Sequence, residues 1–370
     1  MICRHFGECG SCTLYDIDYS EQIEQKVRRL AEMVAPFFKG EISYFESDKE
    51  RYRARAEYKI YKESDSVYYA MRDIKKRGFV MLHECPMVSI AIDKRMWRLL
   101  YIVNSDAELK EKLFGVEFLS TTADELLITM LYHRKLDSSW QKRAKELESE
   151  LDAKVVGRSR KQKIVLSEEY VTERVNVGNR VYIYRHYEQS FTQPNPKVNE
   201  KMIGWAMQSA QEYGCGDLCE LYAGAGNFTI PLSTLFERVI ATEISKRSIK
   251  AALENCRLNG VKNIRFVRMS SEEFTEALEQ KREFNRLKGV NLDSFNIGTI
   301  LVDPPRAGLD DDTRSLISRF DTIIYISCNP ETLVRDLQEL TKSHRVVRTA
   351  LFDQFPYTNH MEAGAVLVKL

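Results

Sequence analysis

Apolar residues recur at helical spacing near the start of the chain, in the stretch 19–35. The apolar positions of this stretch are Ile23, Val27, Leu30 and Met33. Charged residues fill the intervals, so the pattern predicts an amphipathic helix that packs on a neighbouring element. From about 51 to 180, short stretches of alternating polar and apolar residues are separated by charged helical segments. Such alternation is typical of half-buried strands, so this region predicts an α+β domain with an antiparallel sheet.

After residue 187 the pattern changes to short apolar stretches that alternate with helical segments. This order predicts an α/β domain with a doubly wound, mainly parallel sheet. The expected strands are 218–222, 239–243, 264–269, 299–302, 322–327 and 365–370. We therefore divide the chain into a cysteine-rich segment, a central α+β domain and a C-terminal α/β domain. Their expected bounds are 1–18, 19–186 and 187–370.

Composition narrows the function classes. The chain of 370 residues has 55 basic and 54 acidic side chains, and its net charge of +1 lacks the global basicity of a strongly electrostatic nucleic-acid binder. Contacts to RNA would have to come from local patches. No apolar run resembles a secretory signal or a membrane span, which predicts a cytoplasmic protein without a membrane partner. In that reducing compartment the eight cysteines are expected to be buried, catalytic or metal-binding.

A candidate cofactor site follows the first strand of the α/β domain. The apolar stretch 217–222 runs into a turn with Gly224 and Gly226, and such a turn lets the backbone approach a ligand. The dinucleotide pattern would require glycine where Thr229 stands, which argues against a pyrophosphate cofactor. The next strand ends in Glu243, which is placed to accept hydrogen bonds from a ribose diol. Its alternative role is that of a solvated carboxylate.

Three further residues at predicted strand ends carry reactive groups. Asp303 precedes two prolines, which hold an extended loop outside the sheet. Cys328 ends a buried strand and is followed by Asn329 as N-cap and Pro330 as first helical residue. The positive end of that helix is expected to lower the pKa of the thiol, as a nucleophile requires. Glu362, before the last strand, is a candidate general base.

Four motifs resemble signatures of the RNA uracil-5 methyltransferase family, in the same order along the chain. They are 190–195 (Ser-Phe-Thr-Gln-Pro-Asn), 303–309 (Asp-Pro-Pro-Arg-Ala-Gly-Leu), 327–332 (Ser-Cys-Asn-Pro-Glu-Thr) and 352–364. The resemblance implies a Rossmann-like class I methyltransferase domain that uses S-adenosylmethionine. It further implies that the donor pocket is lined by Gln193, Tyr222, Asn227, Glu243 and Asp303. Cys328 would add to carbon 6 of a flipped-out uridine and Glu362 would take the proton from carbon 5. Aromatic residues near Tyr357 are candidates to receive the flipped base.

The first residues carry cysteines at positions 3, 9 and 12, and a fourth is followed by proline at 85. The candidate ligands are Cys3, Cys9, Cys12 and Cys85. One remote ligand suits an iron–sulfur cluster better than a zinc finger, although a zinc site or free thiols remain alternatives. The pattern resembles the [4Fe-4S] motif of relatives that methylate 23S ribosomal RNA. The rest of the chain resembles the enzymes that act on U54 in the tRNA T-loop, which is the substrate we expect. The rRNA enzymes commonly begin with an additional β-barrel RNA-binding domain, and we expect none before Cys3.

Basic residues alternate at Arg51, Arg53 and Arg55, so on a strand they would share one face and contact phosphates. Two further basic runs, 158–163 and 75–77, are candidates to extend these phosphate contacts. The alternative is that each run is simply part of the solvated surface. The alternatives to a tRNA methyltransferase are methylation of 23S rRNA and a role as an RNA-binding or RNA-folding factor with secondary catalysis. No obligate protein partner is implied.

Overall fold

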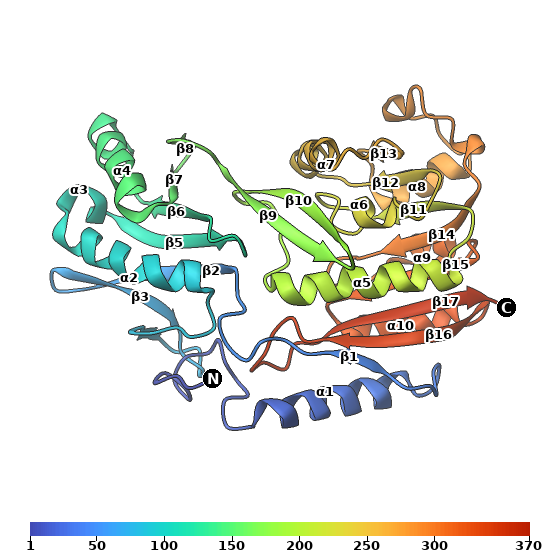
Figure 1. Cartoon of the computed structure of the whole chain (residues 1–370), viewed down its shortest axis with the longest axis horizontal. Coiled ribbons are helices and arrows are strands. Elements are labelled where there is room, and N and C mark those ends of the chain that lie inside the picture. Colours follow the sequence, from blue (N-terminus) through green and yellow to red (C-terminus); the bar gives the residue numbers. More distant parts are fainter.

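The computed structural model describes residues 1–370 and contains two large sheets in two lobes (Figure 1). The C-terminal sheet has eight strands in the order β1-β16-β17-β15-β14-β11-β12-β13. Its strands are β1 (Ser43–Phe45), β11 (Asp217–Leu221), β12 (Val239–Thr242), β13 (Ile264–Val267), β14 (Ile297–Val302), β15 (Thr322–Ser327), β16 (His344–Phe352) and β17 (Glu362–Lys369). The strands from β11 to β15 pair in parallel, whereas β17 is antiparallel to both of its neighbours. The predicted α/β fold with a mainly parallel sheet is confirmed.

Both faces of this sheet are covered by apolar helix surfaces. One face packs on α1 (Tyr19–Val34), α8 (Ser271–Leu278), α9 (Asp311–Ile317) and α10 (Pro330–Leu340). The other packs on α5 (Pro196–Tyr213), α6 (Thr229–Leu232), α7 (Lys246–Leu258) and the hairpin of β9 (Tyr170–Val177) and β10 (Arg180–Tyr187). Because both faces are covered, strands such as β15 are buried at every position and mostly apolar rather than alternating. Two short 3₁₀ turns, Asn285–Leu287 and Leu292–Ser294, precede β14.

The N-terminal lobe contains a seven-stranded sheet in the order β4-β3-β2-β5-β6-β7-β8. Its elements are β2 (Arg55–Glu63), β3 (Ser66–Arg72), β4 (Phe79–Met81), α2 (Ile90–Ser105), α3 (Ala107–Lys110), β5 (Leu113–Ser120), β6 (Leu126–Tyr132), α4 (Ser138–Leu151), β7 (Lys154–Ser159) and β8 (Gln162–Val165). All pairs in this sheet are antiparallel except β6 with β7, which α4 connects. This is the α+β arrangement that the alternating pattern predicts.

Some segments lie apart from the domain in which the sequence placed them. The expected helix 19–35 is α1, but it packs on α10 and β16 in the C-terminal lobe. Strand β1 pairs in parallel with β16 at the edge of the same sheet. The C-terminal sheet therefore contains residues from near both ends of the chain. The division of the chain into three domains stays a proposal. No helix has both the length and the apolar character needed to cross a bilayer.

Candidate active site

The catalytic candidates meet because strand direction brings their positions to one edge of the C-terminal sheet. In the antiparallel pair β15·β17, Ser327 lies opposite Ala363. One position beyond this pair, Cys328 follows the end of β15 and lies opposite Glu362, which is the first residue of β17. Asp303 directly follows β14, which is the parallel neighbour of β15. The sheet thus places a thiol and two carboxyl groups next to one another at a single edge.

The two carboxyl groups have strongly altered acidity. Glu362 is 3% exposed, and its pKa is raised well above 4.5, first by burial and then by the charge of Asp303. Withdrawal from bulk water raises the pKa of Asp303 to about 7. Like charges in a low-dielectric site resist simultaneous ionisation. The two carboxyl groups together therefore retain a proton near neutral pH. As the pH rises they lose this proton, and the pair can then accept one from another group.

The prediction of a low thiol pKa at Cys328 is wrong for the free protein. The expected cap is present: Asn329 accepts a hydrogen bond from the Glu331 N–H (3.2 Å) and Pro330 begins α10. Nevertheless the pKa of Cys328 is raised to about 11 by burial, by Glu362 and by Asp303, while Arg306 opposes them. Burial and two carboxylates outweigh the helix terminus, whose partial charge is only about half a unit. The free thiol of Cys328 therefore stays protonated near neutral pH.

We expect Asp303→Asn to stabilise the free protein above pH 7. Because the folded pKa of Asp303 is about 7 and its ordinary value is 3.8, the unfolded chain binds fewer protons between these values. Stability then falls as the pH rises through this window. The amide lacks this penalty, so the free energy of unfolding should rise by about 4 kcal/mol at pH 8. Thermal melts at pH 8 and pH 3 test this.

The gain should nearly disappear at pH 3, where Asp303 is mostly protonated in both states. Asp65→Asn, at an exposed turn, is the control and should not show a pH-dependent change in Tm. An equal gain at both pH values would mean that packing, rather than ionisation of the carboxyl group, causes the effect.

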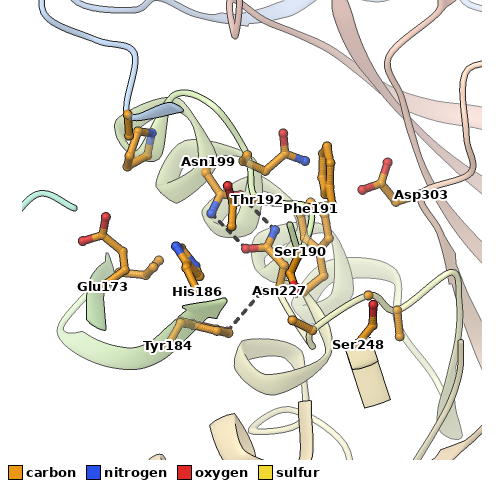
Figure 2. A pocket seen from close by; sticks show the side chains of 18 of the residues that line it. Glu173, Tyr184, His186, Ser190, Phe191, Thr192, Asn199, Asn227, Ser248 and Asp303 are labelled. Carbon is orange, nitrogen blue, oxygen red and sulfur yellow. Dashed lines mark hydrogen bonds between the residues drawn. The ribbon is translucent and has the colours of Figure 1, made fainter. Parts of the chain in front are cut away.

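A partly enclosed cavity opens beside Asp303 and is lined by most of the predicted donor-binding residues. Four of them line it: Gln193, Tyr222, Asn227 and Asp303. Figure 2 shows Asp303 at one end of the cavity, with Glu173 and His186 at the other. The glycine turn contributes Gly224 to the lining of this cavity. Gly224 and Gly226 both have positive φ, at 55° and 85°. Side chains would strain the backbone there.

Other lining residues were not predicted as ligands. Phe191 is 76% exposed, although it lies within the motif that supplied Gln193. Asn199, from α5, exchanges two amide hydrogen bonds of 2.9 Å with Asn227 and so fixes its orientation. The exposed aromatic ring next to Gln193 was the available signal for Phe191. Asn199 gave none, because helical periodicity does not reveal which polar residue faces a cavity.

Glu243 lies in an adjoining groove that shares Tyr222 with this cavity. Its carboxylate accepts hydrogen bonds from the backbone N–H groups of Gly224 (3.0 Å) and Ser245 (2.7 Å). The acid therefore ties the glycine turn to the end of β12. The structure brings four of the five predicted residues into one cavity and the fifth into its continuation.

S-adenosylmethionine fits the donor set of this cavity. Three lining side chains have buried oxygen atoms without a hydrogen-bond partner: Ser190, Thr192 and Glu220. Burial raises the pKa of Glu220 to about 8 and lowers that of His186 to about 4. Uncompensated polar atoms in such a site are unfavourable. A ligand with amino, carboxylate and hydroxyl groups would supply the missing partners.

The four predicted cluster ligands also come together in space. Cys3, Cys9, Cys12 and Cys85 line one small cavity in the N-terminal lobe. The N–H of Arg4 donates to Glu84 and the N–H of His83 donates to His5 (3.0 Å), and these hydrogen bonds hold the segment of Cys85 against the first residues. No set of three or more His, Cys, Asp or Glu side chains is arranged to hold a metal ion. The cluster therefore stays a prediction.

One expectation about the RNA-facing residues is wrong. Strand β2 begins only at Arg55, and Arg51 has φ 61° and pairs with Asp93 (2.9 Å). The three arginines therefore do not form a stripe on one strand, although their phosphate contacts stay a prediction. Tyr357 itself is 4% exposed and belongs to the core of the N-terminal lobe, whereas the role of the aromatic residues near it in receiving a flipped base stays a prediction.

Comparisons with known proteins agree with this geometry. The family model described as tRNA (Uracil-5-)-methyltransferase matches residues 18–370. A tRNA/tmRNA (uracil-C(5))-methyltransferase of Sulfurovum sp. is 57% identical over 370 residues, covering all of both chains. One from Aliarcobacter butzleri is 48% identical, again over both full chains.

A similar fold occurs in the crystal structure of a Pyrococcus abyssi tRNA (uracil-54, C5)-methyltransferase in complex with S-adenosyl-L-homocysteine. Its TM-score is 0.74 at 22% identity, covering 97% of this chain and 86% of that one. At that identity the likeness shows the fold, whereas the family model and full-length relatives show the family. This chain belongs to the tRNA (uracil-5-)-methyltransferase family.

Proposed function

We propose that this protein transfers a methyl group from S-adenosylmethionine to carbon 5 of a uridine in tRNA, and that the target is U54 of the T-loop. The observation that carries the proposal is the register of β15 and β17, which sets Cys328 beside Glu362 at the sheet edge where Asp303 also lies. Relatives of equal length are named for methylation of tRNA and tmRNA. A cytoplasmic location stays a prediction.

Each residue has a distinct task in the proposed reaction. Carbon 5 of uracil is a weak nucleophile, and addition of the Cys328 thiolate to carbon 6 gives carbon 5 enolate character. S-adenosylmethionine, when bound, supplies an electrophilic methyl group. After carbon 5 is methylated, Glu362 takes its proton, the double bond between carbons 5 and 6 re-forms, and the Cys328 thiolate leaves. The uridine must be flipped out of its stack to reach these groups.

The decisive experiment measures transfer of labelled methyl to unmodified tRNA and, separately, to unmodified 23S rRNA, followed by mass spectrometry of the nucleosides. We expect 5-methyluridine at position 54 of tRNA. The cysteine-rich segment favours 23S rRNA as the second candidate, and label in rRNA alone would establish it. RNA binding without any transfer would instead support an RNA-folding role.

We further propose that the four clustered cysteines hold an iron–sulfur cluster. In a tetrahedral zinc site the sulfurs lie about 2.3 Å from the ion, which forces them close together. A cluster of several metal atoms holds its thiolates farther apart. Four cysteines that share a cavity without single-ion geometry fit the second case better. Burial and the neighbouring thiols raise the pKa of Cys12 to about 12.

Anaerobically purified protein is expected to contain iron and sulfide and to absorb broadly in the visible range. Cys85→Ser should remove most of this iron, because it deletes one of the proposed ligands. Cys215→Ser is the matched control, since Cys215 is exposed and lies in the other lobe. Zinc in place of iron, or wild-type iron content in Cys85→Ser, would contradict the proposed ligand set.

We propose that the tRNA also contacts a basic hollow on the N-terminal lobe. The hollow lies between the end of β6 and the turn before β8, and it includes the predicted basic run. Its exposed cations are Lys135, Arg160 and Lys161. At its edge Phe114 and His133 stack with ring centroids 3.9 Å apart. Aromatic faces beside cations suit unpaired bases and the phosphates that join them.

A further inference from the structure

Tyr357 has an unfavourable backbone conformation for an aromatic residue. Its φ is 61°, in the left-handed region that bulky side chains rarely adopt. Such a conformation costs about 1 to 3 kcal/mol and persists only when the surroundings impose it. The residue lies five positions before Glu362, in the segment that joins β16 to β17. Its surroundings therefore influence how the proposed base enters the active site.

The surroundings of Tyr357 come largely from the cysteine-rich segment. Its carbonyl oxygen accepts hydrogen bonds from the N–H groups of Thr13 (2.8 Å) and Leu14 (2.9 Å). Its ring packs near Phe6 and Tyr19, with centroids 6.1 Å from each. Its own N–H donates to the Gln22 side chain (2.9 Å). Thr13 and Leu14 lie before residue 18, where the match to the family model begins.

The rest of the loop 353–361 is anchored by α1. Lys26 forms a buried ion pair with Asp353 (2.7 Å) and also donates to the carbonyl of Phe355 (3.1 Å). The hydroxyl of Tyr19 donates to the second oxygen of Asp353 (2.8 Å). These contacts fix the start of the loop, whereas Tyr357 fixes its middle. From there the chain runs through exposed Asn359 and His360 to Glu362.

We propose that residues 1–14 act as a clamp on Tyr357, and that Tyr357 is a positioning residue for the base Glu362. The inference rests on the proposed methyl transfer. Two backbone hydrogen bonds and the burial of the Tyr357 ring restrict the conformations of this loop, which an ordinary surface loop would sample freely. Thr13 directly follows Cys12, which lines the cysteine cavity. A disruption of that cavity therefore displaces Thr13 and weakens its hydrogen bond to the carbonyl oxygen of Tyr357. Removal of the proton from carbon 5 is the step that depends on the clamp.

The first test is structural and independent of catalysis. Thr13→Pro deletes one N–H donor to Tyr357 without changing the catalytic loop. Hydrogen exchange of a peptide covering 353–361 should become faster in this variant, while exchange in β14 and β15 stays as in the wild type. Unchanged exchange in 353–361 would overturn the clamp. This result does not depend on whether the protein methylates RNA.

The second test measures which reaction step is slowed. Tyr357→Ala should lower kcat about a hundredfold, as expected for a misplaced catalytic group, and change the KM for tRNA less than about threefold. Methylated RNA should accumulate as a covalent adduct, because proton removal fails after methyl transfer. Tyr357→Phe keeps the ring and should restore most of kcat. Tyr101→Ala, at an exposed site on α2, is the control and should behave as the wild type.

Binding of S-adenosylmethionine shows whether the C-terminal lobe of each variant is folded. With binding retained, a loss of kcat without adduct accumulation would overturn the positioning role, as would an unchanged kcat in Tyr357→Ala. If the wild type transfers no methyl group to any RNA, the proposed function fails, but the exchange experiment still decides whether the clamp exists.

Discussion

Cys328→Ala is expected to abolish methyl transfer and to prevent any covalent complex with RNA. Without addition to carbon 6, carbon 5 of uracil stays a poor nucleophile, and no other cysteine lines this edge of the sheet. Loss of a nucleophile typically lowers kcat by about 10⁴-fold or more. Single-turnover assays with labelled S-adenosylmethionine and tRNA measure this loss. Denaturing gels detect the complex.

Two controls separate chemistry from folding. Cys328→Ala should still bind S-adenosylmethionine, because the donor cavity does not include Cys328. Cys219→Ala, in the core strand β11, is expected to reduce stability but to keep the covalent complex. Methylation by Cys328→Ala at even a tenth of the wild-type rate would show that the thiol is not the nucleophile.

Glu362→Gln is expected to trap methylated RNA on the enzyme. The variant still adds Cys328 to the base, but it cannot take the proton whose removal lets the thiolate leave. General bases typically contribute about 10² to 10⁴ in rate, so kcat should fall within that range. Denaturing gels and mass spectrometry should show an adduct that carries the extra methyl group. An adduct without the methyl group would place the block before methyl transfer.

The raised pKa of Glu362 predicts how wild-type turnover depends on pH. The base must be ionised to act, so the rate should increase with pH through a range well above that of an ordinary carboxyl group. The charge of Asp303 is one cause of this shift, so Asp303→Asn should move the acidic limb to lower pH. A limb that stays in place would mean that another group controls the rate, such as the thiol of Cys328.

Much of the candidate site could be read from local patterns. The strands before Gly224, Asp303 and Cys328 were predicted within a few residues, because each is a short apolar run bounded by turn residues. Parallel strands place their carboxyl ends at one edge, so residues that follow different strands were expected to meet. Strand β16, which lies between β1 and β17, was not predicted, because its less buried first half carries polar residues that interrupt the apolar pattern.

The sequence by itself determined the parallel sheet, its glycine turn and the reactive residues at its edge, since these depend on short-range periodicity and on residue types at strand ends. Only the tertiary structure decided the antiparallel direction of β17, the proximity of Cys85 to Cys12 and the burial of Tyr357. It also decided the acidity of Cys328, whose raised pKa reflects surrounding burial and charge more than its helix. Contacts between distant segments and the electrostatic environment they create arise only when the whole chain packs.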